Sequence, residues 1–241
     1  MEIKVMTYNI HHGKGMDKQM DLNRIAEVIQ KSDVDMVGLN EVDKHFSKRS
    51  HYQDQVDELA KKLNMYQSYG PAISLKSKNT MVKRQYGNAL LSRFPILHTK
   101  TYFFHFIPWL TEGRSLLDAE IQINKKVIQV NVTHLSLHPF IHNRQTNFIM
   151  NQWKKKTRPL IIMGDCNMKP GSRGWKKINR QFQDVWHAAG SGEGHTYSSI
   201  RPRYRLDYIF TSPELHIIDA EVVTAMPMAS DHFPLKTTLF I

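Results

Sequence analysis

Residues 160–172, LIIMGDCNMKPGS, join a short apolar run to an abrupt polar ending. The four residues LIIM are typical of a strand that is buried on both faces. Side chains two residues apart in an extended chain point to the same side, so Asp165 and Asn167 would lie together while Cys166 faces away. Such a carboxylate and amide pair can hold a metal, a water molecule or a phosphate. The alternative is a turn in which both side chains bond to nearby backbone groups, and this stretch alone favours the turn.

The same pattern recurs in five other stretches of the chain. Polar residues lie in or beside apolar runs at Asn9 in VMTYNI, Glu41 in MVGLNEVD, His134 in VNVTHL, Asp207 in YRLDYIF, and Asp231 and His232 in ASDHFPL. Each of them taken singly is better explained as a structural polar residue. Strand ends that face loops commonly gather catalytic groups, however, and the repetition favours one shared site.

The residue types of this set indicate the kind of chemistry. They supply carboxylate and amide oxygens and two histidines, but no thiolate. Oxygen ligands suit a hard cation such as Mg²⁺ or Mn²⁺ better than zinc. The histidines are then available to move protons or to stabilise the charge of a phosphoryl group.

Composition narrows the class of protein and of partner. The 241 residues include 33 Lys and Arg against 22 Asp and Glu, a formal charge of +11. This excess favours a polyanionic partner such as nucleic acid or an anionic membrane surface, although a solvated basic surface with no partner is about as common. The single cysteine excludes an intramolecular disulfide and a cysteine-rich metal site. With no secretory signal or membrane-spanning segment in the sequence, we expect a soluble cytoplasmic protein.

The order of the elements predicts one domain over residues 1–241, because no linker or repeat divides the chain. Asp21 is expected to cap a helix, a second helix is expected near residues 56–63 and a third over residues 142–153. The stretches SLLDAEIQI and VIQVNVTHL flank NKK, which indicates a hairpin. Helices alternating with strands, followed by hairpins, predict sheets covered by helices and containing antiparallel strands.

The ordered motifs resemble those of the endonuclease/exonuclease/phosphatase superfamily. They are TYNIHHG, GLNEVD, YGNALLSRFPI, EGRSLL, THL, GDCNMKPGS, RLDYIF and SDHFPL, and they extend from residue 7 to residue 235. Each motif is weak alone, but the ordered set is specific. The resemblance implies an α/β (α+β) four-layer sandwich of the deoxyribonuclease I type, in which two packed mixed β-sheets are flanked by helices. It also implies divalent-metal-dependent hydrolysis of a phosphate ester, with Mg²⁺, or alternatively Mn²⁺, as the cofactor.

The resemblance assigns a role to each matching residue. Glu41 and Asn9 are similar to metal ligands, and Asp231 is expected to assist the metal region. Asp165 is similar to the residue that positions or deprotonates the attacking water, and Asn167 to the one that orients the phosphate. His232 would lie near the scissile phosphate as a base or a charge stabiliser, and Asp207 would fix its tautomer. His134 is the expected second histidine of the site. Asn88 and Arg114 match further positions and are expected to support the site and to contact phosphate, respectively.

Departures from the motifs of particular branches help to place the chain within the superfamily. The abasic-site endonucleases usually have tyrosine where this chain has His134, and LQE where it has LNE. The inositol polyphosphate phosphatases carry a Trp-Cys-Asp-Arg motif near the position of Asp207, where this chain reads RPRYRLDYIF. Both branches are therefore disfavoured, and an intracellular phosphodiesterase of unassigned specificity remains.

Two segments bear on the substrate. Basic residues flank the positions of Asp165 and Asp207 and could track a phosphate backbone, with solvated side chains as an equal alternative: Lys154, Lys155, Lys156, Arg158, Arg173, Lys176, Lys177, Arg180, Arg201, Arg203 and Arg205. The aromatic stretch YFFHFIPWL, residues 102–110, could contact lipid. A buried strand is the preferred interpretation of Tyr102 to Phe106, which leaves Ile107, Trp109 and Leu110 as candidate exposed contacts.

Three functions follow from these observations. The leading prediction is a nuclease-like phosphodiesterase that acts on nucleic acid. The second is hydrolysis of a phospholipid, as in sphingomyelinases, or of a small phosphorylated metabolite, which predicts an apolar or narrow pocket. The third is a binding module that has lost its chemistry, which the presence of the complete polar set disfavours. No stable membrane insertion and no protein partner are predicted.

Overall fold

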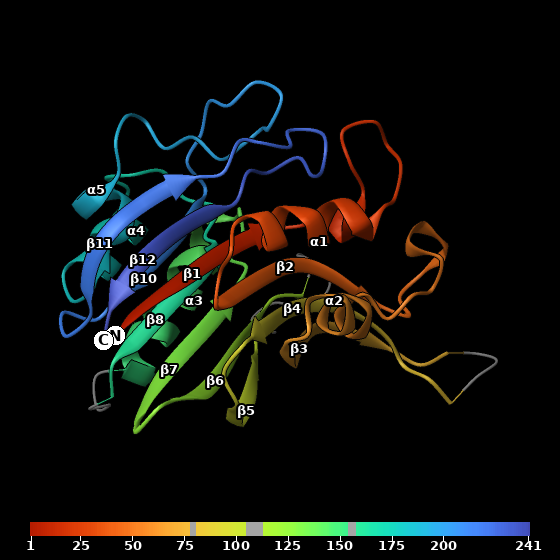
Figure 1. Cartoon of the computed structure of the whole chain (residues 1–241), viewed down its shortest axis with the longest axis horizontal. Coiled ribbons are helices and arrows are strands. Elements are labelled where there is room, and N and C mark those ends of the chain that lie inside the picture. The colour runs from red at the N-terminus through yellow and green to blue at the C-terminus, as the bar shows by residue number, and fades with distance from the viewer. Residues whose placement is uncertain (78–80, 105–112, 154–157) are drawn as a thin grey trace.

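Two six-stranded β-sheets form the centre of the computed structural model, which describes residues 1–77, 81–104, 113–153 and 158–241 (Figure 1). The first sheet has the order β11-β12-β1-β2-β4-β3, with bounds β11 His216–Val222, β12 Leu235–Phe240, β1 Glu2–Asn9, β2 Met36–Lys44, β4 Arg84–Ser92 and β3 Tyr66–Leu75. The second has the order β5-β6-β7-β8-β10-β9, with bounds β5 Ile96–Phe103, β6 Ser115–Ile123, β7 Lys126–Thr133, β8 Leu160–Asp165, β10 Asp207–Thr211 and β9 Gln183–Asp184. Both sheets are mixed, because β1–β2 and β7–β8 are parallel pairs among antiparallel neighbours.

Helices cover the outer faces of the two sheets (Figure 1). The apolar sides of α1 Leu22–Lys31 and α2 Gln55–Leu63 pack on the first sheet, and those of α3 Pro139–Trp153 and α4 Arg173–Asn179 pack on the second. A third apolar cluster, which includes Val5, Val130 and Met163, lies between the sheets. The short α5 Val185–Ala189 follows β9. The predicted α/β four-layer sandwich is therefore confirmed.

Local sequence explains most of the element boundaries. Asp21 accepts a hydrogen bond from the backbone N–H of Asn23 and caps α1 as expected. The third helix begins at Pro139, three residues before the predicted start, because proline is well suited to the first turn of a helix. The predicted hairpin is formed by β6 and β7. Antiparallel pairing of β1 with β12 brings the two ends of the chain together.

The strand that contains the first aromatic residues of the segment 102–110 is less buried than predicted. A strand is present as β5, but most of its side chains are exposed, because β5 is the edge strand of the second sheet. The prediction of a buried strand is therefore wrong for Phe103, which is 50% exposed, whereas Tyr102 is half-buried against Phe148 and Phe104 is buried. Residues 105–112, which contain Ile107, Trp109 and Leu110, lie outside the described residues. Within the described ranges, no helix has the length and apolar character needed to cross a membrane.

Gly164 permits the closest approach of β8 to β7 at the polar end of the sandwich. Its φ is +145°, a backbone conformation that L-residues rarely adopt. A Cβ atom at this position would lie 1.8 Å from the carbonyl oxygen of Thr133, which is backbone and cannot swing aside. The glycine thus lets the chain place the next residue, Asp165, against the neighbouring strand.

Gly164→Ala is therefore expected to lower the free energy of unfolding by more than about 3 kcal/mol, because overlap with backbone adds to the conformational strain. Urea unfolding followed by circular dichroism measures the change. Gly171→Ala is the matched control, since Gly171 also has a positive φ (+74°) but a Cβ atom there would meet nothing within 4 Å; it should cost only about 1–2 kcal/mol. Equal losses in the two variants would contradict the role assigned to Gly164.

Candidate active site

The side chain of Asn40 connects the two sheets directly behind the candidate site. Its amide oxygen accepts a hydrogen bond from the backbone N–H of Asp165 at 2.8 Å, and its NH₂ group donates to Asn88 Oδ1 at 2.8 Å and to the Thr133 carbonyl at 3.0 Å. Asn40 has no exposed surface. In the sequence Asn40 stands out only as a departure from LQE, which does not predict this function. Four strands, β2, β4, β7 and β8, meet at this one side chain.

Glu41 points into the site because β2 is irregular at this position. The pairing of β2 with β4 shifts register between Leu39 and Val42, and Glu41 has a left-handed φ of 59°. A bulge of this kind turns a side chain out of the regular alternation of a strand, and such strain occurs mainly at functional sites. Glu41 Oε1 accepts a hydrogen bond from Asn9 Nδ2 at 3.1 Å. The same Nδ2 donates to Asp165 Oδ2 at 3.1 Å, so that Asn9 joins the two carboxylates.

Asp165 is buried at the centre of this group. Its Oδ2 atom lies 3.5 Å from His134 Nε2 and 3.7 Å from His232 Nε2. Burial, and then repulsion by Asp207, raise the pKa of Asp165 to about 7, although the charge of His232 opposes this shift. Oδ1 of Asp165 accepts the backbone N–H of Asn167 at 3.0 Å. The predicted turn is therefore present at Asp165, whose Oδ1 atom forms it while its Oδ2 atom faces the two histidines; the side chain of Asn167 takes no part in the turn.

His232 is held by Asp207 as the sequence predicted. The Nδ1 atom of His232 lies 2.8 Å from Asp207 Oδ2, and the ring packs against Tyr197 with centroids 4.8 Å apart. Burial by itself would lower the pKa of His232, but Asp207 and Asp165 outweigh it and raise this pKa to about 10. The ring is therefore protonated at neutral pH, which favours a charge stabiliser over a base. Tyr197 lies in an irregular loop and carries no motif, so sequence reasoning missed it.

Asn167 and His134 contact each other on the other side of Asp165. Asn167 has a φ of 46°, and its Nδ2 donates to the Leu135 carbonyl at 3.0 Å. The same group lies 3.0 Å from His134 Nε2, so this nitrogen is an acceptor and the ring proton is assigned to Nδ1. Burial, followed by the charges of Arg114 and His232, lowers the pKa of His134 well below its ordinary value. His134 is accordingly neutral.

The remaining predicted residues lie around this centre. Asn88 is buried, accepts from Asn40 and donates to the Ser115 carbonyl at 3.0 Å, which favours support of the site over contact with substrate. Arg114 is buried and its charge acts on His134. Asp231 Oδ1 lies 3.8 Å from His11 Nδ1, and His11 belongs to the same group of donor atoms as Glu41.

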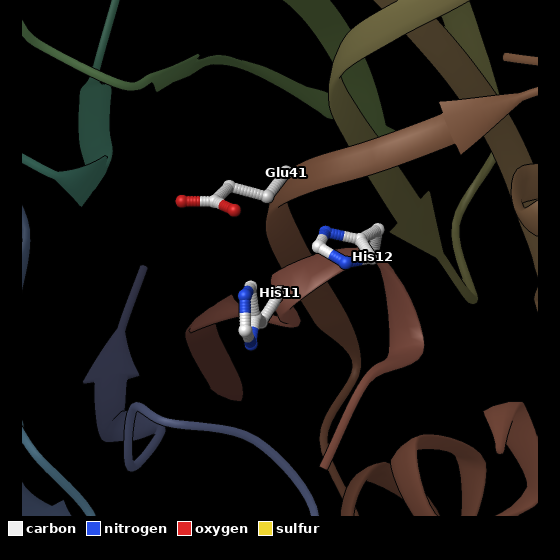
Figure 2. Close-up of side chains that lie close together, drawn as sticks. All are labelled: His11, His12 and Glu41. Atoms are coloured by element: carbon white, nitrogen blue, oxygen red, sulfur yellow. The ribbon is translucent and has the colours of Figure 1, made fainter. Parts of the chain in front are cut away.

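His11 and His12 are further members that sequence reasoning did not select, although they lie two and three residues after Asn9 in TYNIHHG. They form a short 3-10 turn, η1 His11–Gly13, and lie beside Glu41 (Figure 2). Donor atoms of His11, His12 and Glu41 lie within 4.8 Å of one another. Burial, and then the charge of Arg49, lower the pKa of His12 to about 3, so its ring is neutral. The signal available in the sequence was the His-His pair itself.

The donor set fits a divalent cation. Carboxylates of Glu41 and Asp165 both accept from Asn9, Asp231 lies beside His11, and this concentration of negative charge in a partly buried site calls for a compensating cation. Asn9 is oriented with its NH₂ group toward the carboxylates and its oxygen toward the His11 N–H at 3.1 Å. Its predicted role as a metal ligand therefore requires the amide to turn over. Glu41 needs no such change.

A pocket of about 560 Å³ opens beside Asn167. It is lined by Leu137, Pro139, Phe140, His142, Asn143, Asn167, Met168, Lys169, Ser172, Arg173 and Gly174. Of these, Phe140 and Leu137 are exposed apolar side chains, and Lys169 and Arg173 are exposed cations. Lys169 also lies over the ring of Tyr204, with Nζ 5.1 Å from the centroid.

The basic segments predicted to flank the site divide into different groups. Arg201 and Arg203 are exposed, whereas Arg205 is buried and pairs with Asp184 at 2.8 Å. The suggestion that Arg205 tracks a phosphate backbone is therefore wrong, because this guanidinium is buried in an ion pair with Asp184. Lys177 donates to Asn143 at 2.7 Å on the surface of α3. Residues 154–157, which include Lys154, Lys155 and Lys156, lie outside the described residues.

Comparison with known proteins identifies the family. The sequence profile of the Endonuclease/Exonuclease/phosphatase family matches residues 6–232. The chain belongs to this family. Members are hydrolases of phosphate esters that generally use a divalent metal. The predicted resemblance and the general class of enzyme are thus confirmed.

Individual relatives are distant in sequence. The chain is 24% identical to the protein YbhP of Escherichia coli over 99% of this chain and 96% of YbhP. It resembles an endonuclease/exonuclease/phosphatase structure from Beutenbergia cavernae with a TM-score of 0.85 and 23% identity, covering 100% of this chain and 72% of the other. It also resembles a mannosyl-6-phosphatase from Bacteroides thetaiotaomicron with a TM-score of 0.81 and 17% identity, covering 99% and 100%. At these identities the structural likeness shows the fold alone.

Asn40→Ala is expected to lower the free energy of unfolding by about 2 kcal/mol or more, because it leaves buried backbone and amide groups without partners. Thermal and urea unfolding measure this loss. Asn151→Ala, at an exposed position in α3, is the matched control and should change stability by less than about 0.5 kcal/mol. Equal free energies of unfolding in the two variants would show that the hydrogen bonds of Asn40 do not help to hold the sheets together.

The stability contributed by His232 is expected to depend on pH. Its pKa in the folded protein, about 10, lies above the ordinary value of 6.5, so the contribution is fully present below about pH 6.5 and is lost as the pH rises toward 10. The difference in unfolding free energy between the wild type and His232→Gln should therefore shrink by at least about 1 kcal/mol between pH 6.5 and pH 9.5. His98→Gln, on the exposed face of β5, provides the control. A difference that stays constant over this range would show that the ring is not held in its protonated form.

Proposed function

We propose that this protein is a metal-dependent phosphodiesterase, with nucleic acid as its leading substrate. One observation carries the proposal. The Oδ2 atom of Asp165, a buried carboxylate, accepts a hydrogen bond from Asn9 and faces the rings of both His134 and His232. A structural carboxylate needs hydrogen-bond donors but does not need two imidazoles of opposite protonation beside it. This combination is the one expected of a site that transfers protons around a phosphoryl group.

Asp165 acts as the general base in this proposal. Its raised pKa, about 7, lies close to neutral pH, where a base is both available and able to accept a proton. Two hydrogen bonds fix the orientation of Asp165: its backbone N–H donates to Asn40 Oδ1, and its Oδ1 accepts from the backbone N–H of Asn167. The attacking water would therefore meet a carboxylate that does not have to reorganise.

The two histidines have different roles because their protonation differs. His232, protonated and held by Asp207, stabilises negative charge on the phosphoryl oxygens. His134 is neutral, and its Nε2 accepts from Asn167. Rotation of Asn167 toward a bound phosphate would release this nitrogen, and the tautomer of neutral His134 that carries its proton on Nε2 could then donate to a phosphoryl oxygen or to the leaving group.

Glu41 would hold the metal, Mg²⁺ or Mn²⁺, together with Asn9 and Asp231. When bound, the metal supplies positive charge to a non-bridging phosphate oxygen. Arg114, behind His134, adds a fixed positive charge on the opposite side. Asn88 holds Asn40 in place and thereby supports Asp165 without touching the substrate.

Charge and aromatic side chains favour nucleic acid as the substrate. The chain carries a net charge of +11, and the exposed cations Lys169, Arg173, Arg201 and Arg203 lie in the segments next to Asp165 and Asp207. Phe140 and Tyr204 are exposed beside Lys169 and Arg173. Cations that pair with phosphates and rings that stack on bases are the usual elements of single-strand recognition.

A small or amphiphilic phosphate ester is the second candidate, and the pocket beside Asn167 favours it. A volume of about 560 Å³ suits one small molecule or lipid headgroup region better than a duplex. Leu137 and Phe140 at its edge are 74% and 54% exposed and would suit an apolar group. A nucleic-acid substrate would instead place a single nucleotide there.

Glu41→Gln is expected to reduce turnover by at least about a hundredfold while substrate binding is retained, because it removes the charge that holds the metal and preserves the shape of the side chain. Metal-stripped protein with Mg²⁺ or Mn²⁺ restored would be assayed against single- and double-stranded nucleic acid, choline phospholipid, a sugar phosphate and an aryl phosphodiester.

Glu58→Gln, on the exposed face of α2, is the matched control and should retain full activity. Activity confined to lipid or to a small ester would replace nucleic acid by the second candidate. Undiminished turnover by Glu41→Gln on every substrate would overturn the proposed mechanism.

A further inference from the structure

His11, His12 and Glu41 form a compact group of donors at one side of the site. The two histidines follow β1 after one intervening residue, and Glu41 projects from the bulge of β2 toward the same space (Figure 2). Donor atoms of the three residues lie within 4.8 Å of one another. Ligands on one face of a metal ion lie near one another in this way, and only small movements of the three side chains would bring their donor atoms onto one ion.

Two ring nitrogens of this group form no hydrogen bond with the described part of the protein. Nδ1 of His12 and Nδ1 of His11 are buried atoms with no hydrogen-bond partner among the described residues. His12 is only 7% exposed, and a buried polar atom normally has a partner. His11 Nδ1 lies 3.8 Å from Asp231 Oδ1, too far for a hydrogen bond but close enough for both to contact one ion.

A second group of possible ligands, Asp165, Asp207 and His232, differs in this respect. Its donor atoms also lie within 4.8 Å of one another. His232 Nδ1, however, is bonded to Asp207 at 2.8 Å, and Asp165 accepts from Asn9 and Asn167. Asp207 Oδ1 has no hydrogen-bond partner in the described part of the chain, but the Nδ1 atom of the histidine in this group is bonded, whereas the histidine pair beside Glu41 has unused ring nitrogens.

The backbone holds the histidine pair in place. The carbonyl of His12 accepts a hydrogen bond from Gln55 Nε2 at 2.7 Å, and Gln55 Oε1 in turn accepts the backbone N–H of Asp43 at 3.0 Å. Gln55 is fully buried, so α2 fixes the turn to the strand that carries Glu41. The rings of His11 and His12 are in edge contact, with centroids 4.5 Å apart. The donors are thus arranged before a ligand arrives.

We propose that His11 and His12 are metal ligands together with Glu41, with Asp231 as a further donor, and that they make the site selective for first-row transition cations over Mg²⁺. Mg²⁺ prefers oxygen ligands and retains its water molecules, whereas imidazole nitrogen suits Mn²⁺ weakly and Fe²⁺, Co²⁺ and Zn²⁺ increasingly well. The inference deepens the proposed function, on which it rests for the use of Glu41 as a metal ligand.

Metal binding by the full-length, metal-stripped protein tests this inference without reference to activity. Co²⁺ is the probe, because nitrogen coordination changes its visible absorption, and isothermal titration compares its affinity with that of Mg²⁺. We expect Co²⁺ to bind at least tenfold more tightly than Mg²⁺. His12→Phe and His11→Phe, which keep ring volume and remove the donors, should each weaken Co²⁺ binding by about tenfold or more and leave Mg²⁺ binding within about twofold.

His98→Phe, on exposed β5, is the matched control and should bind Co²⁺ as the wild type does. Because His12 is buried, His12→Gln provides a second variant with a polar side chain, and circular dichroism verifies folding of each. Wild-type Co²⁺ affinity and absorption in folded variants of both histidines would overturn the inference. That result, combined with loss of turnover in Glu41→Gln, would leave the proposed function standing; retained turnover in Glu41→Gln with histidine-dependent Co²⁺ binding would refute the function alone.

Discussion

The hydrogen bonds of Asn40 are the constraint on which the geometry of the site depends. Hydrophobic packing between the sheets is strong but non-directional, so by itself it does not fix the position of one sheet relative to the other. Asn40 adds direction, because its one amide meets Asp165, Thr133 and Asn88 at 2.8 to 3.0 Å. Glu41, the next residue in β2, is thereby placed against Asp165, which belongs to the other sheet. The candidate metal ligand and the candidate base are positioned by a single buried side chain.

The same end of the sandwich concentrates unfavourable backbone conformations. Glu41, Asn167, His11 and His12 all have φ values between 45° and 59°, and Gly164 has +145°. Each non-glycine residue in this region costs about 1–2 kcal/mol. The apolar layers beneath the site offset this cost, because β1, β2 and β8 are almost entirely buried before they reach it. Strain and polar side chains therefore occur together where regular strands end, as expected of a site selected for function and not for stability.

Most of the fold could be predicted from the sequence because its signals are local. Asp21 as a helix cap, the hairpin around NKK and the buried strand before Asp165 each depend on a few neighbouring residues. The polar residues at strand ends also identified the candidate site, and the structure brings Asn9, Glu41, Asp165, Asn167 and the two histidines, His134 and His232, together.

What could not be predicted depends on partners distant in the chain. From the sequence alone Arg205 is expected to be a surface cation, and only the fold brings it into contact with Asp184, 21 positions earlier. The exposure of β5 follows from its place at the edge of a sheet, which its own aromatic residues do not encode. Asn40 is one asparagine beside a more prominent glutamate, and its importance appears only when the second sheet is present. The bulge that aims Glu41 likewise arises from pairing between two strands and not from β2 alone.

The net charge of the chain and the carboxylates of the candidate site have opposite signs. The chain as a whole is strongly basic, yet Glu41, Asp165, Asp207 and Asp231 place four carboxylates in the candidate site, where His232 is the protonated ring. A phosphate drawn in by the basic surface would be repelled at the centre unless a cation accompanied it. In the proposed mechanism the basic surface would raise the local concentration of any phosphate ester, while the acidic centre would make productive binding depend on the metal. Discrimination between substrates would then belong to the pocket between Phe140 and Lys169, where exposed apolar side chains lie beside cations.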